Sequence, residues 1–390
     1  MKKVLSIILA FSFIFSVLLT GCSKPTPTSI PDSSSLSNEL VQYFNTTDFK
    51  NENYIASPLS FKVAMSMVAI GADGDTQKQL LDFLDFSSVE ECIEWVSVIN
   101  QDIFESKRKE STLLTANALW KNTTFAGDDN FLPEFKKEIK KTFNGDTYEF
   151  PSDELVNEVN AWSNKNTKGL IPVILKTPPT GPFLLTNSVY MKSPWEKNFS
   201  NESFEDYFTD INGNKQLRKF MSNTDSYKYY KDDASQMVVL PFKEGLSIAL
   251  VLGDTNNLEE KLEKAQEKEV YVSMPIFEIE TSLNNNELID FAKSQNVTFP
   301  FDGELANFKK MVTTNTTNHY VGSISQTSKI IINAEGGEAA SVTVVVMDKN
   351  DVAPMTEIPE SFIANKPFSF FVLAEGKVSS EILFCGQMVK

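Results

Sequence analysis

The sequence predicts a mixed α+β fold whose core is built mainly from large antiparallel sheets. Apolar residues make up 41% of the 390 residues, and Phe alone occurs 30 times, so a sizeable core is available. Helical spacing of apolar residues dominates residues 38–171, whereas runs typical of strands dominate from residue 183 onward. The two kinds of segment do not alternate regularly, which argues against a parallel sheet of βαβ units.

The predicted helices are marked by apolar spacing and by start signals. Residues 38–49 place several apolar side chains on one helical face. Residues 57–72 begin with Ser57-Pro58, a pair typical of a helix start, and continue almost wholly apolar, which predicts a deeply buried helix. Further helices are expected at residues 76–86, 130–143, 153–171 and 286–296.

The predicted strands are rich in β-branched and aromatic residues. Residues 183–195 alternate between apolar and polar side chains, as a strand with one buried face does. Further runs of this kind occupy residues 237–242, 246–253, 270–281, 328–334, 368–375 and 381–389.

The N-terminal segment has the marks of a targeting sequence. Lys2 and Lys3 form a basic front, and an apolar run from Val4 to Leu19 leads through small residues to Cys22. The stretch "LLTGC" resembles a bacterial lipobox, which implies cleavage before Cys22 and lipidation of its thiol. An ordinary signal peptide and a transmembrane helix are the alternatives, although the apolar run is short for a span.

We therefore expect three parts in the chain. Residues 1–21 are a lipoprotein signal peptide, residues 22–37 are a Ser/Thr/Pro-rich tether, and residues 38–390 are one folded domain. The mature protein is expected to be exported and held at the bacterial cell membrane or surface through Cys22.

The charge balance argues against several partners. The formal net charge is −16, and removal of Lys2 and Lys3 with the acid-free residues 1–21 makes it −18. An acidic surface of this kind argues against nucleic-acid binding and against electrostatic attraction to anionic lipid, so that the lipid anchor would have to hold the protein at the membrane.

The inventory of reactive side chains is small. Cys92 and Cys385 remain besides Cys22, and they could pair outside the cell or stay as buried free thiols. His319 is the single histidine, and no nucleophile elbow, phosphate loop, dinucleotide fingerprint or zinc pattern occurs. We therefore expect no enzyme activity, no metal and no cofactor, with His319 in a structural or surface role.

Several stretches of the folded part resemble the serpin family of serine protease inhibitors. Their order and spacing over nearly all of residues 38–390 carry the resemblance. They are the early helix pair at 53–86, the segments at 113–120 and 159–171, the strand at 184–199, the strand at 272–280 with the loop at 299–308, the hinge motif "EGGEAAS" at 335–341, and the C-terminal strands at 364–373 and 382–389.

The resemblance implies a serpin-like fold with three β-sheets, one of them large and central, a cluster of about nine helices and an exposed reactive loop at residues 336–358. It also implies the positions of functional residues. The hinge is expected at Gly336, Gly337, Glu338, Ala339, Ala340 and Ser341. The shutter and breach, two regions that control opening of the central sheet, are expected at Ser57, Pro58, Ser60, Asn187, Trp195 and Gln326.

The implied function is suicide inhibition of serine endopeptidases, with cysteine proteases as a second class. A protease attacks the loop and forms an acyl-enzyme, and the loop then inserts into the central sheet of a metastable monomer and traps the enzyme. The alternatives are a non-inhibitory surface binding protein with this fold, and a hydrolase or solute-binding lipoprotein. The last is disfavoured because catalytic histidine chemistry is missing.

The loop itself has the composition that insertion needs. Small or apolar residues alternate on the face that would turn inward, and Pro first occurs at Pro354, beyond the part that must insert. A non-inhibitory hinge would tolerate Pro or inward charge. The inward-facing residues are Gly337, Ala339, Ser341, Thr343, Val345 and Met347.

Two ways of counting give two scissile bonds. Counting from the hinge leads to Lys349–Asn350, whose Lys suits a trypsin-like pocket, with Asn350–Asp351 as the less suitable neighbour. Counting back from residues 365–368 leads to Met355–Thr356, in a stretch that resembles an elastase-susceptible loop. We favour Lys349–Asn350, because the inserted length determines how far the protease travels.

Three positions depart from the family pattern. Gly337 stands where Thr or Ser is usual, which weakens the strand and predicts slower insertion. Ala334 and Ile276 replace a Glu–Lys pair, for which Glu335 is a candidate substitute. Gln326 replaces the shutter His, so we expect little pH sensitivity of the closed sheet near neutrality.

Overall fold

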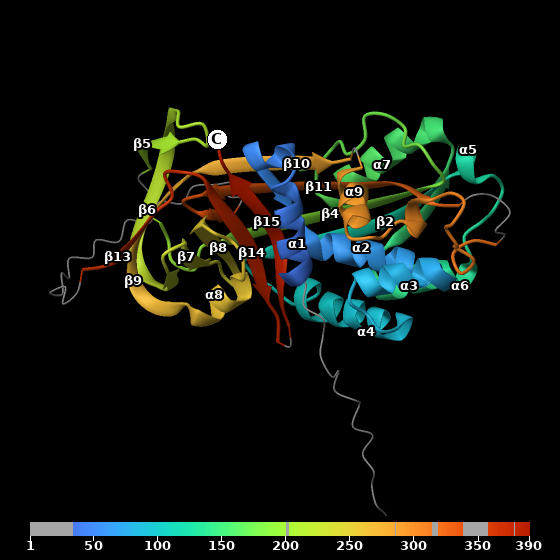
Figure 1. Ribbon diagram of the computed structural model, residues 1–390, viewed down its shortest axis with the longest axis horizontal. Helices are drawn as coiled ribbons and strands as arrows, with labels where there is room; N and C mark the ends of the chain where they lie inside the picture. Colours follow the sequence, from blue (N-terminus) through green and yellow to red (C-terminus); the bar gives the residue numbers. More distant parts are fainter. Residues whose placement is uncertain (1–33, 200–202, 285, 314–318, 338–357, 378) are drawn as a thin grey trace, which may run out of the picture. The chain divides into compact units, whose positions relative to one another are not determined.

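The computed structural model describes residues 34–199, 203–284, 286–313, 319–337, 358–377 and 379–390. Within these residues the chain forms nine α-helices, three short turns of other helix types and fifteen strands (Figure 1). The α-helices are α1 (Ser34–Phe44), α2 (Pro58–Gly71), α3 (Gly74–Phe83), α4 (Val89–Ile99), α5 (Thr123–Ala126), α6 (Pro133–Thr142), α7 (Ser152–Asn166), α8 (Leu258–Lys264) and α9 (Glu287–Ser294). The short turns are η1 (Asp48–Asn51), η2 (Asn100–Phe104) and η3 (Phe299–Phe301).

The strands form two hydrogen-bonded networks. They are β1 (Tyr54–Ala56), β2 (Thr112–Asn122), β3 (Asp146–Phe150), β4 (Phe183–Pro194), β5 (Phe204–Thr209), β6 (Lys215–Lys231), β7 (Ser235–Pro241), β8 (Leu246–Gly253), β9 (Gln266–Pro275), β10 (Phe277–Leu283), β11 (Val321–Asn333), β12 (Gly336–Gly337), β13 (Glu360–Ile363), β14 (Phe368–Glu375) and β15 (Ser380–Met388). Most neighbouring strands run antiparallel, and the parallel pairs are β4–β11, β2–β3 and β9–β13.

The first network is a six-stranded central sheet in the order β10-β11-β12-β4-β2-β3. The second network follows the order β1-β15-β14-β8-β7-β6-β9-β13, with β5 on β6. Strand β6 pairs with β9 over ten positions but with β7 only from Lys228 to Lys231, so this network consists of two sheets joined at one corner. The three-sheet α+β architecture expected from the sequence is therefore confirmed.

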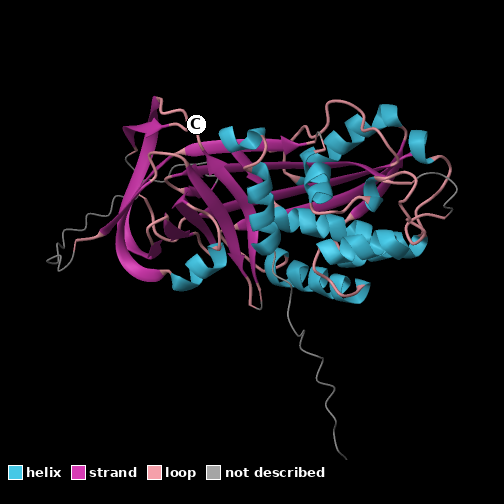
Figure 2. Cartoon of the chain, viewed as in Figure 1, coloured by secondary structure: helices cyan, strands magenta, loops and turns pink. Residues whose placement is uncertain are grey.

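Helix α2 is the most buried element of the helical cluster, most of which lies on one side of the strands (Figure 2). All of its residues from Pro58 to Gly71 are buried, as its nearly continuous apolar sequence predicts. Ser57 caps its first turn by accepting a hydrogen bond from the Ser60 amide. The helix packs against β15 and β4, and so contacts both the second network and the central sheet.

Some boundaries differ from the sequence-based expectation. Helix α1 begins at Ser34, before the expected domain start at residue 38, because Leu36 extends the buried apolar face of the helix into the Ser-rich stretch. The single strand expected at residues 270–281 is two strands, β9 and β10, which end and begin around Ile276 and belong to different sheets.

Candidate functional site

Strands β4 and β11 of the central sheet pair with each other along only part of their length. The two strands pair directly and in parallel at one end, from Val321 opposite Phe183 to Thr327 opposite Ser188. We call this the far end. Beyond Thr327 and Ser188 no further pairs join the two strands.

Strand β12 occupies the other end, which we call the hinge end. Gly336 and Gly337 stand opposite Pro194 and Ser193 of β4, and opposite Asn333 and Ile332 of β11. The short strand is antiparallel to both neighbours and wedges them apart. A sheet that is paired directly at one end and separated by one strand at the other must contain an opening between the two.

A small cavity of about 20 Å³, room for about one water molecule, lies at this opening. Its walls come from β4, from β11 and from the chain that follows α7. The lining residues are Leu170, Ile171, Val189, Tyr190, Met191, Lys329 and Ile331.

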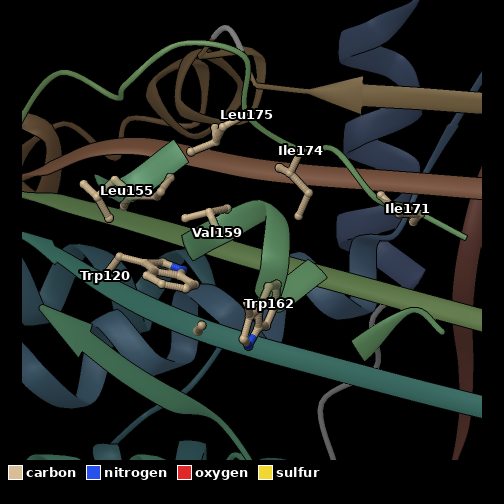
Figure 3. Packing of buried hydrophobic residues seen from close by; sticks show 9 residues of the cluster. Trp120, Leu155, Val159, Trp162, Ile171, Ile174 and Leu175 are labelled. Atoms are coloured by element: carbon tan, nitrogen blue, oxygen red, sulfur yellow. The ribbon is translucent and has the colours of Figure 1, made fainter. Parts of the chain in front are cut away.

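Helix α7 and the segment after it cover the sheet beside the opening. Figure 3 shows side chains of α7 and of residues 171–175 gathered over β2 and β4. The Trp120 and Trp162 rings meet edge to face, with centroids 6.0 Å apart. A strand that enters the opening must therefore pass beneath this packed cluster.

Gly336 can be occupied only by glycine in this arrangement. Its φ is +145°, and a Cβ atom there would overlap the carbonyl oxygen of Ser193. A Cβ atom on Gly337 would come 3.3 Å from the mobile end of the Met191 side chain, a contact that a small shift relieves. Glycine is therefore required at position 336, because the backbone of β4 comes close to it. At position 337 no contact strictly requires glycine.

Trp195 lies directly beside the hinge. Its indole Nε1 donates to the Asn333 carbonyl at 2.8 Å, and its amide donates to the Glu335 carbonyl at 3.2 Å. Its ring stacks on Phe242 with a centroid distance of 4.2 Å. The side-chain oxygen of Asn333 accepts from the amides of Glu335 and Gly336, and so shapes the turn into β12.

Ser57 and Gln326 join the start of α2 to β11. The Ser57 amide donates to Gln326 Oε1 at 2.7 Å, and Gln326 Nε2 donates back to the Ser57 carbonyl at 3.0 Å. The Ser57 hydroxyl donates to the Leu383 carbonyl of β15 at 2.6 Å. Gln326 therefore satisfies both main-chain groups of one residue.

The seam between β4 and β11 at the far end is polar and underpaired. Asn187 donates from Nδ2 to Asn117 Oδ1 at 2.6 Å, but other polar atoms along the seam are buried without a hydrogen-bond partner among the described residues. Each such group costs about 1–3 kcal/mol. The unpartnered atoms on the two strands are Asn187 Oδ1, Ser188 Oγ, Ser325 Oγ and Ser328 Oγ, and those on the neighbouring β2 and α2 are Asn117 Nδ2 and Ser60 Oγ.

The sequence analysis missed Asn117, Ser188, Ser325 and Ser328. The signal that could have found the three serines is the run of small polar residues inside otherwise apolar strands, "TNS" at residues 186–188 and "SISQTS" at residues 323–328. A seam held by such residues separates at a lower cost than an interdigitated apolar seam.

Several predicted site residues lie outside the described residues. They are Cys22, the hinge residues Glu338, Ala339, Ala340 and Ser341, and the candidate scissile residues Lys349, Asn350, Asp351, Met355 and Thr356. Ile358, where the described chain resumes, is 95% exposed.

The positions of the missing ion pair are apolar in the structure. Ala334 lies in the turn before β12, and the Ile276 amide donates to the Lys219 carbonyl. Within the described part of the chain, none of the ion pairs involves the carboxylate of Glu335, the expected substitute.

The remaining reactive side chains are buried. His319 is 1% exposed, stacks on Phe183, and places Nε2 3.3 Å from Asp129 Oδ2, so its role is structural. Cys92 and Cys385 are free thiols, and burial raises their pKa values to about 11 and about 12. Of the two alternatives for these cysteines, the unpaired one is present.

Neither a metal site nor a membrane-spanning helix is found in the described residues. These residues contain no cluster of three or more His, Cys, Asp or Glu side chains suited to a metal ion. None of their helices has both the length and the apolar character needed to cross a membrane.

Known proteins are similar to this chain in sequence and in architecture. The Leukocyte elastase inhibitor of Homo sapiens is 30% identical over 368 residues, which cover 86% of this chain and 92% of that protein. The native thermophilic serpin tengpin superposes with a TM-score of 0.80 at 24% identity, covering 92% of this chain and 94% of tengpin. Human thyroxine-binding globulin in complex with its ligand superposes with a TM-score of 0.78 at 18% identity, covering 92% and 97%.

The family model described as Serpin (serine protease inhibitor) matches residues 32–390. This range contains α1, the opening between β4 and β11, and the C-terminal strands. The match and the relative at 30% identity together show that the chain belongs to the serpin family.

Proposed function

We propose that this protein is a suicide inhibitor of serine endopeptidases, with cysteine proteases as a second target class. The observation that carries the proposal is the opening between β4 and β11, with the first two residues of the hinge already lodged at one end. An ordinary core strand that leads into a surface loop does not require an opening of this kind in the sheet.

The register of β12, continued along the chain, predicts which residues would fill the opening. Gly337 stands opposite Ser193 and Ile332, so Ala339 would stand opposite Met191 and Ile330, all of which are buried. The small side chains at residues 337, 339 and 341 would therefore face the core, as their size requires. Glu338 would stand opposite Lys192, where an opposite-charge pair across the strands is favourable.

The same register limits how far insertion can go. Ten residues beyond Gly337, Met347 would stand opposite Phe183, the first residue of β4. The direct β4–β11 pairs at the far end would separate, and the new strand would pair with both neighbours instead. Lys349–Asn350 lies just past this limit, which supports the count from the hinge over Met355–Thr356.

The covalent step belongs to the protease. Its nucleophile attacks the Lys349 carbonyl carbon, the bond to the Asn350 nitrogen breaks, and that nitrogen leaves as a new amino terminus after taking a proton from the enzyme. Water would normally release the acyl group. Insertion of residues 338–347 carries the acylated protease away from the hinge end before this hydrolysis, and the chain itself catalyses nothing.

The test is to mix the soluble chain, beginning at Ser23, with trypsin, elastase and subtilisin in separate reactions. A band at the summed mass that survives SDS, together with a released peptide beginning at Asn350, is the expected result with trypsin. Lys349→Ala should abolish the trypsin complex, and Met355→Ala is the matched control that should keep it. Cleavage that leaves every protease fully active would overturn inhibition of these classes.

A binding role is the second candidate, and the likeness to thyroxine-binding globulin favours it. That likeness shows that the fold also serves a protein that carries a small ligand. Clean cleavage without a complex, together with a ligand that raises the melting temperature, would support this candidate.

The place of action is part of the proposal. We propose that residues 1–21 direct export, that Cys22 carries the lipid anchor at the bacterial membrane, and that residues from Ser23 to the start of α1 are a tether. A Cys22→Ser variant should take up no labelled fatty acid, whereas the wild type should take it up. Equal labelling of the two chains would contradict the anchor.

A further inference from the structure

The carboxylate of Glu244 binds the backbone of residues 109–111, which leads into β2. We call this contact the Glu244 grip. Glu244 lies in the turn between β7 and β8, and its two oxygens accept hydrogen bonds from the amides of Lys109, Glu110 and Ser111 at 2.6, 3.1 and 2.7 Å. Backbone hydrogen bonds, first that from Lys109, lower the pKa of Glu244 to about 2. The carboxylate therefore stays ionised, and bonds of this kind are stronger than neutral ones.

Ser111 links the Glu244 grip to β4 through its hydroxyl group. The hydroxyls of Ser111 and Ser193 lie 2.7 Å apart, and both also reach the carbonyl oxygen of Lys243, at 3.2 and 3.3 Å. The Lys243 amide in turn donates to the Pro194 carbonyl at 3.0 Å. Both serines are buried, so the contact between their hydroxyls is shielded from water, whereas Glu244 itself is exposed. The set joins the β7–β8 turn to the last residues of β4.

The residues of β4 that these hydrogen bonds reach are the ones that pair with β12. Ser193 and Pro194 stand opposite Gly337 and Gly336. At the far end, where β4 and β11 are directly paired, one strand spacing of about 4.8 Å separates them. At the hinge end β12 separates them by two spacings, roughly 9.6 Å, and an anchor outside the central sheet would help to hold β4 at this distance.

We propose that Glu244 is a positioning residue that acts through Ser111 and Ser193 to hold the end of β4 one strand away from β11. It thereby keeps the hinge lodged between them and sets how readily the loop inserts after cleavage. The second part rests on the proposed inhibitory function, whereas the first part concerns the uncleaved protein alone. Ala334 and Ile276 are apolar and cannot form the ion pair that the family pattern places at this end of the sheet.

The experiment is hydrogen exchange followed by mass spectrometry on the full-length mature chain. Glu244→Gln removes the charge and replaces one of the two accepting oxygens with an NH₂ group, which cannot accept from the backbone amides. Ser111→Ala leaves the grip on the backbone intact but cuts the link to Ser193. Glu110→Gln is the matched control, because it makes the same charge change and loses only an exposed ion pair with Lys243.

The expected result is exchange about tenfold faster in peptides covering residues 189–195 and 333–337 for Glu244→Gln and Ser111→Ala. Glu110→Gln should stay within about twofold of the wild type. Acceleration confined to residues 109–111, unchanged exchange in both variants, or equal acceleration in all three would overturn the proposal.

A second readout separates the inference from the function on which part of it rests. In a functioning inhibitor, Glu244→Gln should raise the fraction of chains cleaved without complex formation, while the rate of the first attack on the loop stays unchanged. Faster exchange with an unchanged cleaved fraction would overturn the insertion part. If the wild type forms no complex with any protease, the inhibitory function fails, and the exchange data alone decide the positioning role.

Discussion

Gly336 is the residue at which the chain turns from β11 into the opening. Its positive φ and the closeness of the Ser193 carbonyl leave no room for a side chain, whereas Gly337 has room for a methyl group. The two neighbouring glycines therefore provide a matched pair of substitutions at the hinge.

We expect Gly336→Ala to destabilise the native protein by about 1–3 kcal/mol, because it adds backbone strain and displaces β12. Gly337→Ala should be neutral or slightly stabilising, since Ala has the higher strand stability and Met191 can yield. Urea unfolding of both variants measures the difference. Equal effects at the two positions would show that β12 does not hold this geometry in solution.

His319 makes a pH-dependent contribution to stability. Burial lowers its pKa, and this outweighs Asp129, which raises the pKa, while Lys121 lowers it. The folded state thus favours the neutral ring. The contribution is fully present above the unfolded pKa of about 6.5 and is lost as the pH falls below it, by at most about 1.4 kcal/mol per pH unit.

Denaturation midpoints between pH 4.5 and 8 test this expectation, with about 6.5 as the turning point. His319→Gln should remove the part of the acid loss that belongs to the imidazole. With Gln326 in the shutter, the midpoint should change little between pH 7 and 8. An acid branch that is identical in wild type and variant would count against His319 as its source.

At the scale of elements, the seam between β4 and β11 combines direct pairing with unsatisfied hydroxyls. Ser325 is fully buried on β11, and its Oγ has no hydrogen-bond partner among the described residues. Burial of such a group weakens the closed seam relative to an apolar one. The seam is therefore expected to favour opening at the expense of native stability.

Ser325→Ala should stabilise the native protein by about 1 kcal/mol, because it removes an unpaired buried hydroxyl at little cost in volume. The same variant should insert its loop more slowly and be cleaved as a substrate more often. Ser57→Ala is the contrasting control, since it loses the bond to Leu383 and the cap of α2 and should cost about 0.5–2 kcal/mol. Both are measured by urea unfolding and by the ratio of complex to cleaved chain; a destabilised Ser325→Ala would contradict this account of the seam.

At the scale of the whole molecule, cleavage in the loop should produce a more stable fold. Residues 338–347 would gain neighbours on both sides, and about ten new net-favourable backbone bonds at about 1 kcal/mol each are expected. The melting temperature after cleavage should rise on the order of 20 °C. Circular dichroism melts of intact and cut chains test this, and equal melting temperatures would mean that the loop does not insert.

Elements whose sequence pattern matches their burial could be predicted. Helix α2 is apolar all round and buried all round, and β4, β8, β14 and β15 are β-rich runs that lie inside the molecule. Strand β6 was missed because its residues are mostly polar and its burial is irregular along a half-exposed strand. Helix α4 was missed although its buried residues Cys92, Trp95, Val96 and Ile99 have helical spacing.

The candidate site likewise has features that the sequence predicts and features that it does not. Small residues at the hinge, the absence of Pro before Pro354 and the position of Gln326 are properties of the chain that can be read without coordinates. The grip of Glu244 on Ser111 joins residues 133 positions apart, and no local pattern marks it. The unsatisfied seam could not be predicted either, because it depends on which strands face each other.

The sequence by itself determined the α+β class, the buried α2 helix and the alternation of small residues after the hinge glycines. These follow from composition and from local periodicity, which act within a few residues. The tertiary structure alone decided the register of β4, β12 and β11, the opening between them, the unpaired state of Cys92 and Cys385 and the burial of His319. These depend on contacts between segments more than a hundred residues apart, whose partners are selected only when the whole core is packed.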